Sequence, residues 1–400
     1  MRLSTFLWRA AVAVAASLVL APGALATKPV AVSCGQVITR DTKLANDLSD
    51  CHGIGLVVGA DGVTLDLNGH TVDGDGVADF EGIQVKNHDR AIVKNGRITD
   101  FVEGVGVLFS TGTRIRDLSI ARERHVAVFV GDSDDVIAER NAAADVAFAG
   151  LFATRSHDVR FQRNSVTTSG AGIAVRVSDH VAIAANTLSQ NADGPGVFLF
   201  DGTSDSRVEH NTLVDNGDGI VLDGGPVRNV IASNSESGSG AGAVLVAAEA
   251  NRIEGNLFAG NIFVGVVLVG SDDNRVESNS IVDSGHDPES EGGIHLVSND
   301  DGSTSDRNLI VKNTLTGNAP DGLLVDAGQA DTRVDSNRSD RNADDGIDVG
   351  SPATTLTGNT ANRNHDLGIE AVAGVTDGGG NRARGNGNPL QCVDVFCKTG

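Results

Sequence analysis

The sequence repeats at an interval of about 23 residues over most of its length, and each repeat is marked by a glycine followed by Ile, Val, Leu or Ala. One beat, near Ala127, lacks the glycine, and two late repeats are longer, at 28 and 29 residues. The marker glycines are Gly82, Gly104, Gly150, Gly172, Gly196, Gly219, Gly242, Gly265, Gly293, Gly322, Gly346 and Gly368. A fixed period of this size is typical of a solenoid, in which each repeat is one structural unit stacked on the last.

One repeat, residues 207–223, indicates what kind of unit is stacked. Its apolar residues include Val208, Leu213, Ile220 and Leu222, and polar residues separate most of them. Alternation in such short runs predicts strands with one buried face, and no repeat contains a run long enough for a helical pattern. Leucine-rich repeats have a similar period but need a denser leucine pattern. The 50 glycines suit tight turns between short strands.

A column of asparagines recurs in step with the glycines. If the coils stack in register, these side chains lie above one another at a spacing of about 4.8 Å. Stacked amides can hydrogen-bond along the axis, so we interpret the column as a structural ladder rather than as a binding surface. Its members are Asn141, Asn164, Asn186, Asn211, Asn234, Asn256, Asn279, Asn313, Asn337 and Asn359.

The repeat from Asn211 to Leu222 resembles the coil of the right-handed parallel β-helix family, within the pectate-lyase-like group that includes NosD-type periplasmic proteins. Residues 34–51 and 62–70 resemble the first coils of many secreted bacterial β-helix proteins. The resemblance implies an all-β chain folded as a single-stranded right-handed parallel β-helix of about 13 or more coils. It implies no particular function, because this fold hosts lyases, glycosidases, epimerases, copper-delivery accessory proteins and adhesins.

The first 26 residues read as a secretory signal. Arg2 and Arg9 give a positive start, an apolar stretch follows at 10–20, and Ala24-Leu25-Ala26 forms a cleavage site. We therefore expect a secreted protein, extracellular or periplasmic, with no membrane insertion. Residues 27–400 are expected to form one β-helix. It would have an N-terminal cap at about 27–60 and a C-terminal end at about 385–400, closed by a disulfide.

The four cysteines lie near the two ends of the chain. In an oxidising compartment, closure within each end is the simplest arrangement, so we expect Cys34–Cys51 and Cys392–Cys397. A zinc site of four cysteines would require the two ends of a long rod to meet, and no metal site is therefore assigned.

The formal charge of −22 disfavours nucleic acid as a partner. It also disfavours polyanionic glycans, unless cations bridge them to the protein. No cofactor is certain, and calcium is possible at three acidic turns, residues 132–135, 271–273 and 299–302. The same residue types are common in ordinary turns.

Aromatic and sulfur-containing residues are scarce. The single Trp, Trp8, lies in the signal segment, the chain has no Tyr, and the only Met is Met1. The mature chain therefore lacks the usual aromatic platforms for sugars, and a copper site of soft ligands is hard to assemble.

In the strand after each marker glycine, the first and third residues should point inward and the second and fourth outward. The outward set is apolar in the middle of the chain, where Phe198 and Phe200 are candidate contacts for a partner. Arg176, Asp201 and Asp223 form a second candidate group there, although Phe200 interrupts their column. The alternative is a flat β face that simply tolerates apolar residues.

Toward the C-terminal end the outward set becomes polar, with His295, Asp326, Asp348 and Glu370. Asp348 and Glu370 occupy the same position in adjacent coils, so their backbones should lie about 4.8 Å apart. Two carboxylates at this spacing suit a glycosidase. In that interpretation they serve as nucleophile or base and as acid, with His295 transferring protons or positioning substrate, and Asp326 binding. The alternative is a solvated acidic surface.

Two classes of function remain open. The first is a secreted β-helix that binds a polysaccharide or a surface protein without catalysis. The second is a polysaccharide hydrolase or lyase that uses the acidic outward face. The sequence does not predict the oligomeric state.

Overall fold

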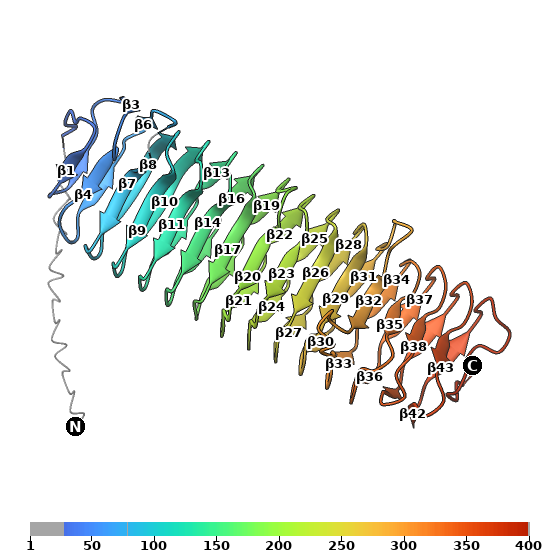
Figure 1. Cartoon of the computed structure of the whole chain (residues 1–400). Coiled ribbons are helices and arrows are strands. Elements are labelled where there is room, and N and C mark those ends of the chain that lie inside the picture. The colour runs from blue at the N-terminus through green and yellow to red at the C-terminus, as the bar shows by residue number, and fades with distance from the viewer. Residues whose placement is uncertain (1–27, 78, 399–400) are drawn as a thin grey trace, which may run out of the picture.

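A computed structural model describes residues 28–77 and 79–398, which form one straight rod of stacked coils (Figure 1). The two ends of the described chain lie at opposite ends of the rod. The expected signal segment, residues 1–26, lies outside the described residues. The described residues form no helix, so none of their segments is a helix long and apolar enough to cross a membrane.

Each coil contributes strands to three ladders, and every strand pairs in parallel with its counterpart in the next coil. The ladder that we name the first sheet has 15 strands. They are β1 (Gln36–Ile38), β4 (Leu56–Val58), β7 (Glu81–Lys86), β9 (Glu103–Leu108), β11 (Val126–Gly131), β14 (Ala149–Thr154), β17 (Ala171–Arg176), β20 (Val197–Phe200), β23 (Ile220–Asp223), β26 (Ala241–Val246), β29 (Val264–Val269), β32 (Gly292–Val297), β35 (Leu323–Val325), β38 (Ile347–Val349) and β41 (Ile369–Ala371). The expected right-handed parallel β-helix is confirmed.

The second sheet follows the first in each coil. It contains β2 (Thr42–Lys43), β5 (Thr64–Asp66), β8 (Ile92–Thr99), β10 (Arg114–Ala121), β12 (Ile137–Glu139), β15 (Arg160–Gln162), β18 (Ala182–Ala184), β21 (Arg207–Glu209), β24 (Val230–Ala232), β27 (Arg252–Glu254), β30 (Arg275–Glu277), β33 (Leu309–Val311), β36 (Arg333–Asp335), β39 (Thr355–Thr357) and β42 (Thr376–Gly379). The long strands β8 and β10 continue into the third sheet.

The third sheet completes the coil. Its remaining strands are β3 (Leu48–Cys51), β6 (Thr71–Gly74), β13 (Ala142–Ala144), β16 (Ser165–Thr167), β19 (Thr187–Ser189), β22 (Thr212–Val214), β25 (Ser235–Ser237), β28 (Leu257–Ala259), β31 (Ser280–Val282), β34 (Thr314–Thr316), β37 (Arg338–Asp340), β40 (Thr360–Asn362) and β43 (Arg382–Arg384). Disulfides join Cys34 to Cys51 and Cys392 to Cys397, as predicted.

The alternation of side chains follows the expected register. In β23, Ile220 and Leu222 are fully buried, whereas Val221 is half-buried and Asp223 is exposed. Inward residues of this kind form one apolar core that runs through the rod from Val32 to Ala371. The burial of apolar area in each coil is the main source of its stability.

The marker glycines are required because consecutive coils approach closely at these positions. A Cβ on Gly219 would lie 2.4 Å from the carbonyl oxygen of Gly242 in the next coil, closer than van der Waals contact allows. At the beat without a glycine, Ala127 takes the place and is fully buried. The period in the sequence is therefore a direct record of how the coils stack.

The asparagine column forms the predicted ladder. Asn211 donates from Nδ2 to Oδ1 of Asn234 at 3.0 Å and to the carbonyl oxygen of Ile183 at 2.9 Å. These contacts satisfy polar groups buried at the turn between the second and third sheets. Two further ladders occur at other turns, and they contain Asn229, Asn251, Asn274 and Asn308, and Asn318, Asn342, Asn364 and Asn386.

One inward position carries a carboxyl group. Glu236 is fully buried between Leu213 and Phe258, its neighbours in adjacent coils of the third sheet. Neither of its carboxyl oxygens makes a hydrogen bond of normal geometry. Burial raises the pKa of Glu236 to about 7, because the apolar surroundings disfavour the charged form.

Candidate functional site

The side chains that point outward from the first sheet, which we name the outer face, form a continuous central column. Its members follow the strand register from β11 to β41: Phe129, Phe152, Ala174, Phe198, Val221, Val244, Val267, His295, Leu324, Asp348 and Glu370. The column is apolar as far as β29 and mainly polar beyond it. The change of character predicted along this face is therefore present.

The apolar part contains a cluster of rings on β11, β14 and β20 and on the turn before β14. We name it the phenylalanine cluster: Phe129, Phe148, Phe152, Phe198 and Phe200. The rings of Phe198 and Phe200 stack with centroids 4.3 Å apart, and Phe152 stacks on Phe200 at 6.3 Å. Phe152 is 8% exposed, whereas the other rings are only partly covered. The cluster therefore presents ring surface to solvent from a rigid support.

Charged groups border this cluster. The Arg176 guanidinium lies 5.9 Å from the centroid of the Phe200 ring, and its Nε donates to Oδ2 of Asp201 at 2.7 Å. Asp223 is the partner of Phe200 in the next strand and is exposed. The structure thus brings Phe198, Phe200, Arg176 and Asp223 together on β17, β20 and β23.

The polar end of the outer face contains a group that we name the acidic cluster: Asp321, Asp345, Asp348 and Glu370. Asp348 pairs with Glu370 in the register of β38 and β41, as predicted. Burial, followed by the negative charges of Glu370 and Asp326, raises the pKa of Asp348 to about 6. The placement fits the expected carboxylate pair, although it tests no catalytic role.

Two members of the acidic cluster were missed by the sequence reasoning. Asp321 and Asp345 are buried, and each accepts a backbone hydrogen bond from the next coil, at Asp345 N and Leu367 N respectively. Burial raises the pKa of Asp321 to about 6, and burial also raises the pKa of Asp345. The signal in the sequence was their position three residues before the central column, outside the strand that the alternating pattern marks.

His295 does not join the carboxylate pair. Leu324 lies between His295 and Asp348 in the strand register. The His295 ring instead lies between two other carboxylates, with Nδ1 3.1 Å from Glu291 Oε2 and Nε2 3.1 Å from Asp326 Oδ1. Both are ion-pair distances without the angles of a hydrogen bond. Burial opposes the charged imidazolium, but the two carboxylates outweigh burial and raise the pKa of His295.

Two insertions, residues 285–291 and 299–305, lengthen the two long repeats. The contact of Glu291 with His295 attaches the first insertion to the first sheet. A shallow depression of about 630 Å³ lies between this insertion and the following turns. Gly285, Asp287, Pro320, Asp344 and His365 are among the residues that line it. Asp344 adjoins Asp345, so the depression opens beside the acidic cluster.

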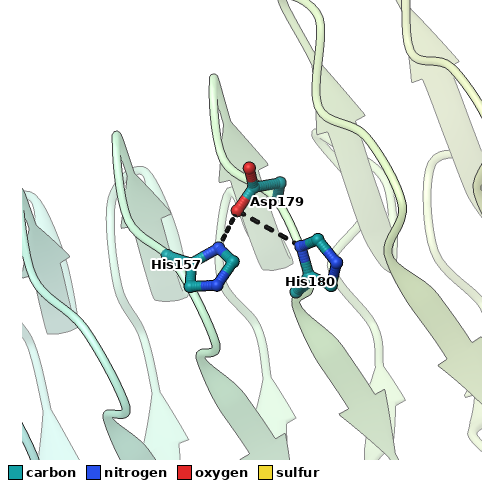
Figure 2. A group of neighbouring side chains, drawn as sticks. All are labelled: His157, Asp179 and His180. Atoms are coloured by element: carbon teal, nitrogen blue, oxygen red, sulfur yellow. Dashed lines mark hydrogen bonds and ion pairs between the residues drawn. The ribbon is translucent and has the colours of Figure 1, made fainter.

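Three groups of side chains among the described residues have a spacing that could hold a metal ion. They are His157, Asp179 and His180; Asp134, His157 and Asp158; and Asp344, Asp345 and Asp366. The first group lies on adjacent turns that follow the first sheet, with both histidine rings directed at the Asp179 carboxylate (Figure 2). Sequence reasoning followed the outward positions of the strands after the marker glycines, and it missed this group because its members lie on the turns.

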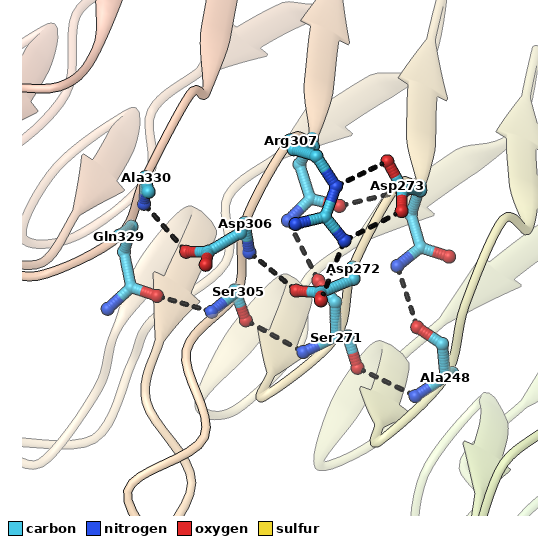
Figure 3. A network of polar contacts seen from close by, with 11 residues as sticks. Ala248, Ser271, Asp272, Asp273, Ser305, Asp306, Arg307, Gln329 and Ala330 are labelled. Carbon is cyan, nitrogen blue, oxygen red and sulfur yellow. Dashed lines mark hydrogen bonds and ion pairs between the residues drawn. The ribbon is translucent and has the colours of Figure 1, made fainter.

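In the acidic turn at 271–273, the two carboxylates form ion pairs with an arginine side chain. Arg307 donates to Asp273 Oδ1 at 2.9 Å and to Asp272 Oδ2 at 2.9 Å, as Figure 3 shows. Parallel rows of side-chain to backbone hydrogen bonds continue from this turn into the next coils, through Ser305 and Asp306. These carboxylates therefore act in coil stacking, and calcium at the other acidic turns stays a prediction.

Two family models match the sequence. The model described as "Periplasmic copper-binding protein (NosD)" matches residues 67–235 and 149–292, which together make up more than half of the chain. The model described as "Right handed beta helix region" matches residues 229–388. No curated protein matches the sequence closely.

Several solved structures share the fold. Alginate lyase AlyF-OU02 with G6 matches at 14% identity and a TM-score of 0.53, over 80% of this chain and 81% of that one. A tailspike mutant of E. coli bacteriophage HK620 in complex with pentasaccharide matches at 12% identity and 0.51, over 91% and 74%. The Dettilon tailspike protein matches at 15% and 0.52, over 72% and 62%. This chain thus spans less than two thirds of the Dettilon tailspike. XylC, solved with xylose, matches at 13% identity and a TM-score of 0.43, over 51% of this chain and 43% of that one.

Proposed function

We propose that this chain, which belongs to the family of right-handed β-helix proteins described by the NosD model, binds a polysaccharide along the outer face of the first sheet. The observation that carries the proposal is the phenylalanine cluster with its charged border. Solved β-helix structures that contain an oligosaccharide support a carbohydrate as the class of ligand.

The phenylalanine cluster has the chemistry of a sugar-binding surface. Binding sites for small ligands combine apolar and aromatic side chains with a few placed polar groups. Phe198 and Phe200 supply ring faces, and Arg176 and Asp223 supply a donor and an acceptor beside them. Because coils repeat at about 4.8 Å along the rod, the outer face can contact several consecutive units of an extended chain.

The charge of the protein restricts the ligand. A net charge of −22 repels polyanions, so we expect a neutral polysaccharide or an acidic one bridged by cations. A location in the periplasm or outside the cell is supported by the two disulfides and by the description of the family as periplasmic.

The family description also names copper, and the ligands of this chain restrict how copper could bind. Carriers of Cu(I) use thiolate and thioether ligands. All four cysteines are paired in disulfides and the only Met is Met1, so such a site does not fit the described residues. Imidazole and carboxylate groups remain, and they suit Cu(II) or other divalent metals.

The test is a binding screen of the mature protein against neutral and acidic polysaccharides, with and without calcium. Phe200→Ala should weaken binding of the best ligand by about tenfold or more, because it removes the ring that contacts both Phe198 and Phe152. Leu257→Ala is the matched control, since Leu257 is 40% exposed on the third sheet. Equal loss in both variants, or no binding of any polysaccharide, would refute the proposal.

A second candidate is hydrolysis at the acidic cluster, which the raised pKa of Asp348 favours. A general acid needs a carboxyl group that keeps its proton near neutral pH, beside a second carboxylate that acts as nucleophile or base. Asp348 and Glu370 would be this pair. Asp348→Asn and Glu370→Gln should then each reduce the release of reducing ends by orders of magnitude, with the folded circular dichroism spectrum intact. Binding without turnover would remove this candidate and leave the first.

A further inference from the structure

We propose that His157, Asp179 and His180 form a binding site for a divalent first-row transition metal ion. The three residues lie on the turns that connect β14 to β15 and β17 to β18, between the first and second sheets (Figure 2). The site is separate from the outer face and from the acidic cluster, and it does not depend on a polysaccharide ligand.

The stacking of the coils brings the three side chains together. His157 and Asp179 occupy equivalent places in adjacent coils and are joined by a parallel bridge, and His180 follows Asp179 directly. One ligand atom from each residue lies within 4.8 Å of the other two, and His180 Nδ1 is 3.5 Å from Asp179 Oδ1. Tetrahedral zinc with bonds of about 2.0–2.2 Å needs ligand atoms somewhat more than 3 Å apart, so small side-chain rotations suffice.

The surroundings prepare His157 for coordination. Its Nδ1 faces Asp179, and its Nε2 lies 3.3 Å from Asp158 Oδ2. Asp158 can therefore accept the Nε2 proton and leave Nδ1 unprotonated for a metal. Histidine ligands in metalloproteins commonly donate their second nitrogen to a carboxylate in this way, which fixes the tautomer and the ring orientation.

The charge pattern of these turns sets this position apart. On equivalent or nearby turns an arginine pairs with the aspartate, as Arg228 does with Asp205 at 2.6 Å. At Asp179 the ion-pair partners are both histidines. A histidine can exchange its proton for a metal ion, whereas an arginine cannot lose its proton.

A metal ion could reach the site without rearrangement of the fold. The side chains of His157, Asp179 and His180 are about half exposed. A depression of about 700 Å³ adjoins them and is lined by Asp134, His157 and Asp179, among others. Two imidazoles and one carboxylate leave coordination positions open to water or to a ligand, which favours Zn²⁺, Ni²⁺ or Cu²⁺ over the all-oxygen cations Ca²⁺ and Mg²⁺.

The experiment is calorimetric titration of the EDTA-treated mature protein with Zn²⁺ alone, at about pH 8 so that histidine is largely neutral. We expect saturable binding that His180→Asn weakens by about tenfold or more. The backbone of His180 is left-handed, at φ 54°, and asparagine tolerates that conformation. His210→Asn is the matched control, because His210 is exposed, has φ 56° and lies outside the group.

Asp179→Asn provides an independent reading if His180→Asn fails to fold by circular dichroism, and it should weaken Zn²⁺ binding in the same way. The proposal is overturned if the wild-type protein binds no Zn²⁺, or if His180→Asn and Asp179→Asn bind it as tightly as His210→Asn does. The assignment of a transition metal to this site is overturned if Ca²⁺ binds the same residues more tightly than Zn²⁺. None of these outcomes depends on whether the protein binds a polysaccharide.

Discussion

The outer face of the first sheet differs at its two ends, although the backbone beneath it is the same. From β11 to β20 the outward side chains are mainly Phe, Ala and Val, which pack on one another as a second small core outside the rod. From β32 to β41 the outward side chains include His295, which is buried beside an insertion, the half-buried Asp348 and the exposed Glu370. The buried Asp321 and Asp345 lie just before β35 and β38. Inward residues are Val, Ile, Leu or Ala in both regions.

The difference separates what the fold requires from what it leaves free. Stacking requires the marker glycines, the inward apolar residues and the asparagine ladders, and these continue from one region to the other. The outward positions carry no such requirement, since their contacts differ from coil to coil. Chemistry specific to this protein is therefore expected in the outward columns and in the turns.

The largest expected effect tests the inward and outward register on which the comparison rests. Ile220→Asp places an unpaired carboxylate in the apolar core and should lower the free energy of unfolding by about 4 kcal/mol or more. Val221→Asp, one residue later, faces outward and should cost less than about 1 kcal/mol. Thermal and urea melts followed by circular dichroism measure both. Similar losses in the two variants would mean that the register is wrong.

The next effect concerns a carboxyl group on the inner side. Glu236 has a pKa of about 7 in the folded protein against an ordinary 4.5, so the folded state holds its proton more tightly than the unfolded state does. Its contribution to stability is full below about pH 4.5 and is lost as the pH rises through about 7, by about 3 kcal/mol in total.

Glu236→Gln should remove this pH dependence and make the protein more stable than wild type at pH 8. Glu254→Gln is the control, because Glu254 is outward in β27. Urea melts between pH 4 and pH 8 measure the difference. A wild-type stability that does not fall across this range would contradict the assignment of Glu236 to the interior.

A smaller effect of the same sign is expected at the acidic end of the outer face. The pKa of Asp348 is about 6 against an ordinary 3.8, so its contribution to stability is lost as the pH rises from about 3.8 through 6. Asp348 is only half-buried, and solvent screening reduces the effect to about 1 kcal/mol. Asp348→Asn should stabilise the protein by this amount at pH 8, whereas Asp223→Asn, which is exposed, should have no effect. Equal free energies of unfolding for wild type and Asp348→Asn at pH 8 would contradict the raised pKa of Asp348.

The smallest effect concerns the charged border of the phenylalanine cluster. Arg176→Ala removes the guanidinium beside Phe200 and should weaken polysaccharide binding by about two- to fivefold. Arg207→Ala on the second sheet should leave binding unchanged, since Arg207 pairs with Glu209 and lies away from the outer face. Titration calorimetry with the best ligand of the screen measures both. A larger loss in Arg207→Ala would place the ligand on the second sheet.

The sequence predicted the features that the stacking repeats enforce. The glycine period, the asparagine ladder and the alternation in β23 all follow from contacts that recur in every coil. The pairing of Asp348 with Glu370 followed from the same register. Cys34–Cys51 and Cys392–Cys397 followed from their places at the two ends.

Features that depend on a single coil could not be predicted in this way. Glu236 has the polar character of an outward residue, and only the register of the third sheet reveals that it points inward. His295 was grouped with Asp348 because both lie in the outward column, but the ring of His295 contacts Glu291 of an insertion instead. His157 and His180 meet because His157 is paired with Asp179 of the next coil, and His180 directly follows Asp179.

The most direct test of the central claim is a crystal structure of the protein with the oligosaccharide that binds best in the screen. We predict density for the sugar on the outer face of the first sheet, with rings against Phe198 and Phe200 and polar contacts to Arg176 or Asp223. An oligosaccharide bound instead to the second or third sheet, with the phenylalanine cluster free, would contradict the account.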